Sequence, residues 1–166
     1  MHTEPAALLP ERFVAMMARG VSVIVASRNE ARVPSVMRAV GSRVRDGGRQ
    51  ITVYLARSQG QCLLDDIARS GAMAVVFSQP ESHLTLQLKT RRAQVRALRD
   101  DDWPALMRYR ESMEREVGAV GFGPAFVHAM LAHRLDDVVA VDFCPEDAFD
   151  QSPGPRAGAS LLPPAS

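Results

Sequence analysis

Short runs of apolar and β-branched residues recur along this chain, and polar or glycine-containing turns separate them. The clearest run is VSVIVAS at 21–27, whose length and β-branched residues are typical of a strand. Other segments alternate between apolar and polar residues, as strands with one exposed face do. The pattern predicts strands at 21–27, 33–44, 51–56, 72–78, 138–143 and within 84–98.

Apolar residues three or four positions apart predict helices between these strands. Pro10 suits a first helical turn and Gly20 a helix end, while Asp102 is the expected N-cap of a longer helix that has Pro104 in its first turn. The predicted helices lie near 10–19, 61–71, 102–117 and 124–133.

The last segment of the chain, 145–166, is rich in proline and glycine and has no periodicity. We therefore expect one domain over 1–144 and an extended tail over 145–166, either disordered or laid over the surface. The predicted fold is mainly β with flanking helices, a small antiparallel barrel of about six strands, because closure removes the edges that many short strands would expose.

Composition fits one soluble domain. The chain has 166 residues, of which 46% are hydrophobic and 23% charged. No apolar run approaches the roughly 18 residues of a membrane span, so we expect a cytoplasmic protein that does not bind membranes. Cys62 and Cys144 cannot form a disulfide framework, and neither they nor the scattered histidines have metal-ligand spacing.

The charges are nearly balanced overall, with a net charge of +1, but residues 1–99 are basic and residues 100–166 are acidic. A basic half could suit an anionic ligand such as a phosphate, or its own acidic partner half. Aromatic residues make up only 5% of the chain, which argues against nucleic-acid binding.

Two strands carry polar residues that could form a site. Arg38 shares a strand face with valines, where its charge needs an ion pair, an edge position that reaches water, or a bound phosphate or carboxylate. Gln87 and Lys89 lie opposite a leucine face, either in solvent or against a heteroaromatic ligand at a dimer interface. No dinucleotide or P-loop motif is present, and no catalytic nucleophile is identified.

The order of these elements, with the strings VSVIVASRNEARVPSVMRAVGSRV, ITVYLA, AMAVVFSQP and LTLQLK, resembles the pyridoxamine 5′-phosphate oxidase-like, FMN-binding split-barrel family. The ending FDQSPGPRAG is similar to the QTPGPxAG ending of one uncharacterised branch of that family. The resemblance implies a six-stranded antiparallel split β-barrel that forms a homodimer with flavin at the interface.

The resemblance also implies cofactor-binding residues. Arg38 and Arg43 match the ends of the family pattern R-x-x-x-x-K, which contact the FMN phosphate and ring, and Gln87 is similar to a glutamine that approaches the flavin. Lys89 could lie near the N1–C2 region of the flavin. The loop after 51–56 would face the phosphate, but Gln59, Gly60 and Gln61 stand where the family carries Ser-Arg-Lys, and Arg57 and Ser58 could compensate.

The implied function is an FMN-dependent oxidoreductase that acts on an unidentified small molecule. True pyridoxamine phosphate oxidases end in a segment with tryptophan and arginine, whereas the only tryptophan here is Trp103, so we do not expect pyridoxal phosphate synthesis. The alternatives are a non-catalytic flavin carrier or stress-related flavin-binding protein, and a split barrel that binds a deazaflavin or haem. Haem would require an axial ligand such as His83, His128 or His133.

Overall fold

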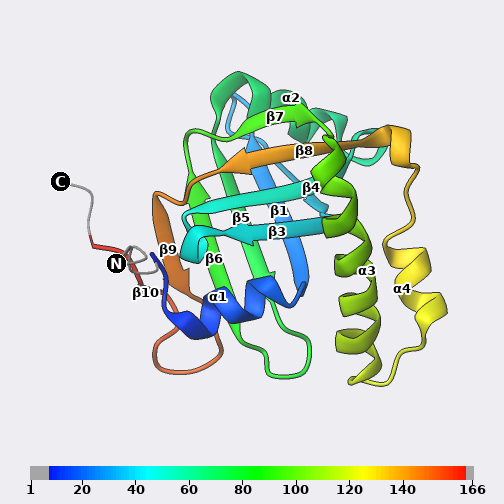
Figure 1. The fold of residues 1–166 in the computed structure, drawn as a ribbon. Coiled ribbons are helices and arrows are strands. Elements are labelled where there is room, and N and C mark those ends of the chain that lie inside the picture. Colours follow the sequence, from blue (N-terminus) through cyan, green and yellow to red (C-terminus); the bar gives the residue numbers. More distant parts are fainter. Residues whose placement is uncertain (1–7, 164–166) are drawn as a thin grey trace, which may run out of the picture.

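Two antiparallel β-sheets with helices around them form the structure, a computed structural model that describes residues 8–163 (Figure 1). Sheet A has the strand order β10-β9-β6-β5-β1-β2, and sheet B has the order β3-β4-β8-β7. The strands of sheet A are β1 (Ser22–Arg28), β2 (Pro34–Arg38), β5 (Met73–Ser78), β6 (Thr85–Thr90), β9 (Asp147–Asp150) and β10 (Ala159–Ser160). Those of sheet B are β3 (Gly41–Arg45), β4 (Gln50–Ala56), β7 (Gln94–Ala97) and β8 (Val138–Phe143). The fold is therefore mainly β with flanking helices, as the sequence pattern predicts.

Four α-helices overlap the ranges predicted from apolar spacing. They are α1 (Glu11–Ala18), α2 (Gln61–Ser70), α3 (Trp103–Gly118) and α4 (Pro124–Met130). Figure 1 shows α3 and α4 side by side at one end of sheet B, with α1 and α2 at opposite ends of the strands of sheet A. Within the described residues, no helix is both long and apolar enough to cross a membrane.

The predicted strand 33–44 is divided by a bend that carries the chain from sheet A to sheet B. The Ala39 amide donates to the Val23 carbonyl of sheet A at 3.0 Å, and the next amide, Val40, donates to the Tyr54 carbonyl of sheet B at 2.8 Å. Because consecutive amides bond to different sheets, one continuous pattern in the sequence becomes β2 and β3.

A second bend divides the predicted strand within 84–98 into β6 and β7, and β8 continues into β9 beside it. The register is the same on both sides of this bend: Lys89 pairs with Asp147 in sheet A, and Gln94 pairs with Asp142 in sheet B. The two bent strands therefore form one long antiparallel ladder that belongs to both sheets. These bends and the two strands after Phe143 turn the six predicted strands into ten shorter ones.

The prediction of a tail over 145–166 needs correction, because β9 is an integral strand of sheet A. It pairs with β6 over four positions, and the side chain of Ala148 is fully buried in the core. The segment DAFD is too short and too polar for its pattern to predict a strand; the strand forms because β8 delivers it to the free edge of β6. Residues 1–7 and 164–166 of the predicted domain and tail lie outside the described residues.

The main core lies between the two sheets and is closed by α1 and α2. Val23 and Val25 of β1 face Val53 and Leu55 of β4, and all four are fully buried. A second apolar cluster joins the outer face of sheet B to the first turns of α3, where Tyr54 packs with its neighbours. Part of the outer face of sheet B is thus covered by α3, whereas the outward side chains of sheet A are all half-buried or exposed in the described strands.

Gly71 fixes the end of α2 against the second bend. It has a left-handed φ of 68°, and its amide donates to the Ile67 carbonyl at 2.8 Å, as in a helix C-cap. Its carbonyl accepts from the Ala93 amide at 3.0 Å, and a Cβ at Gly71 would lie 2.5 Å from the Arg91 carbonyl oxygen. The position therefore requires glycine for both its backbone angle and its close approach.

We expect Gly71→Ala to lower the free energy of unfolding by more than about 2 kcal/mol, because left-handed strain adds to a backbone clash. Gly121→Ala is the matched control: its φ is also positive, at 94°, but nothing lies within 4 Å of its Cβ position. The control should lose only about 1 kcal/mol. Urea unfolding midpoints measure both, and equal losses would show that the close approach does not matter.

Candidate functional site

The outer face of sheet A brings together three of the predicted site residues. One row of cross-strand neighbours runs over five strands, and a second row lies two residues further along them. The first row is Arg38, Ile24, Val76, Gln87 and Phe149, and the second is Val36, Ala26, Ala74, Lys89 and Asp147. Ile24 and Val76 of the first row and Val36, Ala26 and Ala74 of the second are apolar, and we call these five residues the apolar strip.

Polar groups stand at both ends of the apolar strip. On one side, Arg38 is half-buried and its Nη1 donates to Ser22 Oγ at 2.7 Å. On the other, the amide oxygen of Gln87 accepts from Gln151 Nε2 at 3.3 Å, and Lys89 Nζ lies 5.1 Å from the centre of the Phe149 ring. An apolar surface with a few polar groups at its borders suits a heteroaromatic ligand, which has an apolar face and a polar edge.

A cavity of about 330 Å³ adjoins the strip at the end of β1. Its floor is largely apolar, and four basic side chains line it with one acidic neighbour, Asp147. We call it the basic cavity. The cations are Arg28, Arg32, Lys89 and Arg91. None of them forms an ion pair within the described part of the chain. This excess of unpaired positive charge favours an anionic ligand.

The sequence analysis missed Arg28, Arg32 and Arg91 as site residues. The first two flank the turn between β1 and β2, in which Arg32 has a φ of 63° and donates its amide to the Asn29 carbonyl at 2.9 Å. Arg91 lies in the bend after β6. Turn and bend come together only because β1 pairs with β5 and β5 with β6, so no local pattern could have predicted the cavity.

The loop after β4 does not lie open to an anion. The Ser58 amide donates to both oxygens of the Asp137 carboxylate, at 3.0 and 3.2 Å, and the Ser58 hydroxyl donates to the same group. Gln59 Nε2 donates to the Ala132 carbonyl at 3.0 Å, and Gln61 Nε2 to Asp65 Oδ1 at 2.8 Å. Arg57 is exposed. The donors expected to face a phosphate are thus largely used within the protein.

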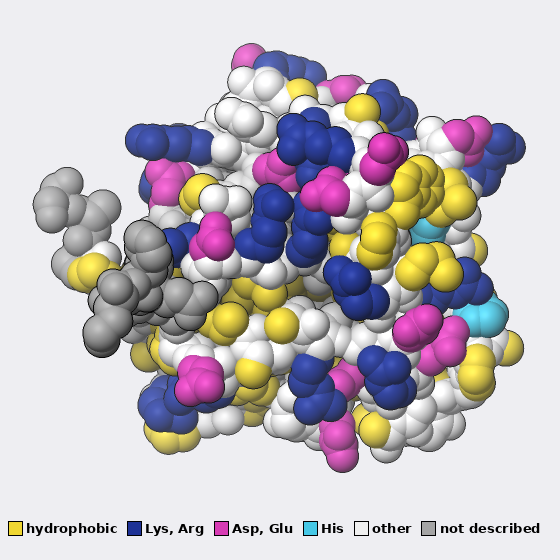
Figure 2. Space-filling model, in the orientation of Figure 1, with side chains coloured by type: hydrophobic (Ala, Val, Ile, Leu, Met, Phe, Trp, Pro, Cys, Tyr) yellow, Lys and Arg dark blue, Asp and Glu magenta, His cyan; other side chains and the backbone are white. Residues whose placement is uncertain are grey.

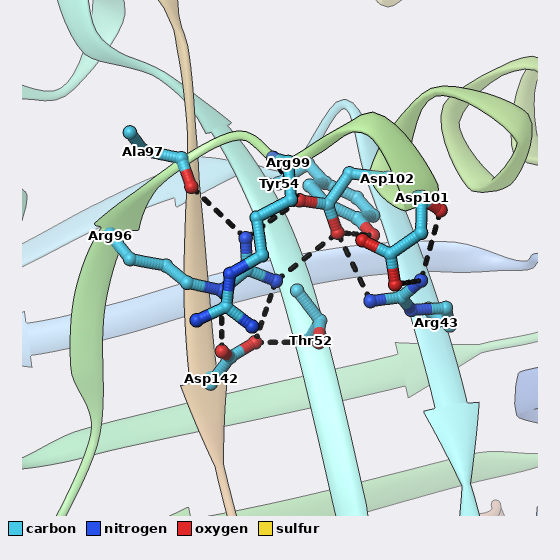
Figure 3. Close-up of polar contacts among 9 residues, drawn as sticks. All are labelled: Arg43, Thr52, Tyr54, Arg96, Ala97, Arg99, Asp101, Asp102 and Asp142. Carbon is cyan, nitrogen blue, oxygen red and sulfur yellow. Dashed lines mark hydrogen bonds and ion pairs between the residues drawn. The ribbon is translucent and has the colours of Figure 1, made fainter.

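Arg43 belongs to a polar cluster on the outer face of sheet B, away from the apolar strip (Figure 3). Its Nη1 donates to the Asp101 carbonyl at 3.0 Å and to the Asp101 carboxylate at 3.1 Å, and its Nη2 donates to Asp102 Oδ1 at 3.1 Å. Only 15% of the side chain is exposed. The ion pairs of Arg43 with Asp101 and Asp102 thus join the basic half of the chain, 1–99, to the acidic half, 100–166.

Asp102 is the centre of this cluster, with a side chain that is 0% exposed. Arg96 donates to both of its oxygens, at 2.6 and 3.1 Å, Tyr54 Oη donates at 2.8 Å and the Arg99 amide at 2.8 Å. Burial alone would raise the pKa of Asp102, but the hydrogen bonds from Arg96, the Arg99 amide and Tyr54 hold that pKa well below its usual range. Asp102 precedes α3, as predicted, yet its side chain makes no capping hydrogen bond to α3; it accepts instead from the Arg99 amide and so caps the short 3-10 turn Asp100–Asp102.

A second carboxylate on the outer face of sheet B, Asp142, is also bound by neighbouring side chains. Arg96 Nε also donates to Asp142 Oδ2 at 2.5 Å, and Thr52 Oγ1 donates to Asp142 Oδ1 at 2.7 Å. Figure 2 shows basic and acidic side chains alternating over the face that carries sheet B and α3. The cations here neutralise the protein's own carboxylates, in contrast to those of the basic cavity.

Comparison with known proteins identifies the fold. Neither a protein-family model nor a curated protein matches the sequence. A putative pyridoxamine 5′-phosphate oxidase from Lactobacillus delbrueckii matches with a TM-score of 0.54 and 17% identity, over 90% of this chain and 97% of its own. HupZ from Group A Streptococcus matches at 0.55 and 14%, over 90% and 100%. An F420 reductase matches at 0.53 and 15%, over 84% and 98%. The chain therefore has the pyridoxamine 5′-phosphate oxidase-like fold that the sequence resemblance predicted.

We expect Asp102→Asn to destabilise the protein by about 3–5 kcal/mol, the range for removing one member of a buried ion pair. Asp142→Asn, whose carboxylate is 33% exposed, is the matched control and should lose less. Because the pKa of Asp102 is lowered on folding, its contribution is present above 3.8, the ordinary value, and is lost as the pH falls. Urea unfolding at pH 7 and pH 3 should therefore show a smaller pH dependence in Asp102→Asn; an unchanged dependence contradicts the assignment.

Proposed function

We propose that this protein binds a flavin, FMN by preference, on the outer face of sheet A, and that it acts as a flavin-dependent oxidoreductase on an unidentified small molecule. The observation that carries the proposal is the apolar strip with Arg38, Gln87 and Lys89 at its borders. The fold adds support, because the similar structures include a putative pyridoxamine 5′-phosphate oxidase and an F420 reductase. We propose the cytoplasm as its compartment, where the exposed Cys62 and Cys144 stay reduced.

We also propose that the two sheets are the halves of one split barrel of six bent strands. The pairing supports this: β1 pairs with β2, which continues as β3 and pairs with β4, and β4 pairs with β8. The continuation of β8 as β9 pairs with β6, which pairs with β5, which pairs again with β1. Such an arrangement leaves the outer face of sheet A free to hold a ligand.

The residues of the strip fit an isoalloxazine ring better than they fit the rest of FMN. The Gln87 amide can both donate to and accept from the polar edge of the ring, and the Lys89 ammonium would stabilise negative charge on a reduced ring. Ile24, Ala26 and Val76 form a surface on which the ring can lie without water. Bound flavin would supply the electron transfer, while these residues orient the ring and set its polarity.

A second copy of the chain is the proposed cover for this face. Val36, at the β2 edge of the strip, is 64% exposed although its neighbours are apolar. If two copies paired through this face about a two-fold axis, the apolar strips of both copies would be buried and water would be excluded from both flavin rings. Each copy would contribute the same residues to the interface. We therefore propose a homodimer with flavin at the interface.

A deazaflavin is the second candidate, and the basic cavity is the observation that favours it, since a cofactor with a longer anionic tail needs a wider basic groove. A flavin carrier without turnover would use the same residues. Haem has less support, because none of the proposed axial ligands lines the basic cavity or any of three other well-formed cavities in the described residues. His128 lies 2.7 Å from Glu114, and His133 contacts the Leu131 carbonyl.

Purified protein should quench FMN fluorescence saturably, and Lys89→Ala should weaken FMN binding about tenfold, since one charge-assisted hydrogen bond contributes about 1.5–3 kcal/mol. Arg110→Ala, which removes an exposed cation from α3, is the charge-matched control and should bind as the wild type does. The visible spectrum distinguishes flavin from deazaflavin and haem. Wild-type protein that binds no flavin would refute the proposal.

Val36→Asp should shift the protein from dimer to monomer and weaken FMN binding, because it places a charge on an exposed apolar position of the proposed interface. Met107→Asp is the control: Met107 is 58% exposed, but it lies on α3. Light scattering after size-exclusion chromatography measures the mass of each variant. A monomeric wild type, or a Val36→Asp variant that remains dimeric, argues against this interface.

A further inference from the structure

We infer that the phosphate of FMN binds in the basic cavity, with Arg28 and Arg91 as its principal partners, and not at the loop after β4. This inference rests on the proposed flavin site and assigns the part of it that holds the anionic tail. A phosphate dianion in a protein is held by several charged or amide donors whose hydrogen bonds are free. The question is therefore which cations near the apolar strip still have free donors.

The loop after β4 lacks free hydrogen-bond donors for a phosphate. Ser58, whose amide and hydroxyl would be the natural phosphate donors, already binds the carboxylate of Asp137 with both. A phosphate at this place would have to displace that carboxylate or lie beside it, and two like charges within a few ångströms repel each other. Arg57 alone remains, and one exposed guanidinium is a weak anion site.

Arg43 cannot supply the missing donors. Both of its terminal nitrogens bind Asp101 and Asp102, and the second of these carboxylates is completely buried. Withdrawing the guanidinium would leave part of a buried charge without a partner, which costs several kcal/mol. Arg43 also lies on the outer face of sheet B, whereas the apolar strip lies on sheet A.

The basic cavity does contain several cations whose side-chain donors are free to bind a phosphate. Its three arginines and Lys89 make no ion pair in the described residues, and a single carboxylate, Asp147, lines it with them. Glu146 lies nearby, but its carboxylate accepts from the Arg91 amide and pairs with Arg92 at 3.8 Å. The guanidinium groups of Arg28 and Arg91 therefore remain available for bidentate contacts with phosphate oxygens.

The cavity is also continuous with the proposed ring site. Ala26, Ala74 and Lys89 belong to both the second row of the outer face and the cavity lining. Arg28 follows Ala26 by two residues on β1, which is about 6.6 Å along a strand. A ring over the strip can therefore extend its ribityl chain along β1 and bring the phosphate to Arg28. Lys89, at the boundary, faces both parts of the ligand.

Titrations with FMN and with riboflavin test this assignment, because riboflavin has the same ring and ribityl chain but no phosphate. We expect the wild type to bind FMN at least tenfold more tightly than riboflavin. The double variant Arg28→Ala/Arg91→Ala should bind the two flavins about equally and keep the riboflavin affinity of the wild type. Arg57→Ala/Ser58→Ala is the matched control at the other loop and should keep the wild-type preference for FMN. Thermal unfolding of each variant verifies that it is folded.

The outcomes separate this inference from the proposed function. If wild-type protein binds both flavins but Arg28→Ala/Arg91→Ala keeps the preference for FMN, the phosphate assignment is wrong and the flavin site stands. Loss of the preference in Arg57→Ala/Ser58→Ala would likewise move the phosphate to the loop after β4. If the wild type binds neither flavin, both proposals fail. The preference should also decrease with added salt in the wild type, since it depends on charge.

Discussion

The arrangement of sheet B and α3 depends on the hydrogen bonds and ion pairs that the buried carboxylate of Asp102 accepts. It accepts hydrogen bonds from Arg43 of β3, Tyr54 of β4 and Arg96 of β7, just before α3 begins. A fully buried carboxylate is stable only when cations lie beside it and hydrogen-bond donors reach its oxygens. These three strands and the start of α3 must therefore keep one geometry. The acidic second half of the chain is held to the basic first half mainly here (Figure 3).

This interaction divides the cations of the protein into two groups. Over sheet B, Arg43 and Arg96 are paired with carboxylates and contribute to folding. On the outer face of sheet A, Arg28 and Lys89 have no such partners in the described residues. Exposed cations without an ion pair contribute little to the stability of the chain alone, and we therefore propose that they are the part of the structure that recognises a ligand.

The bends connect these two regions. Because β2 continues as β3, and β6 as β7, the same bent strands carry Arg43 and Arg96 of the cluster around Asp102 on one sheet and Arg38, Gln87 and Lys89 at the borders of the apolar strip on the other. The second bend is held by Gly71, which also brings Ala72 and Arg91 to the basic cavity. A change in the packing of the bend should therefore alter the site as well as the stability.

The sequence by itself determined the β-rich class, the approximate positions of the helices and the polar character of Gln87 and Lys89, because these follow from periods of two and of three to four residues. The fold family was also recognisable from the order of its strings. Only the tertiary structure decided that 33–44 is two strands, that 147–150 joins sheet A, that Arg43 is paired with Asp101 and Asp102, and that Arg28 and Arg91 line one cavity. The physical reason is that local periodicity records which face of a strand is buried, whereas the partner of a charge depends on strand pairing between residues far apart in the chain.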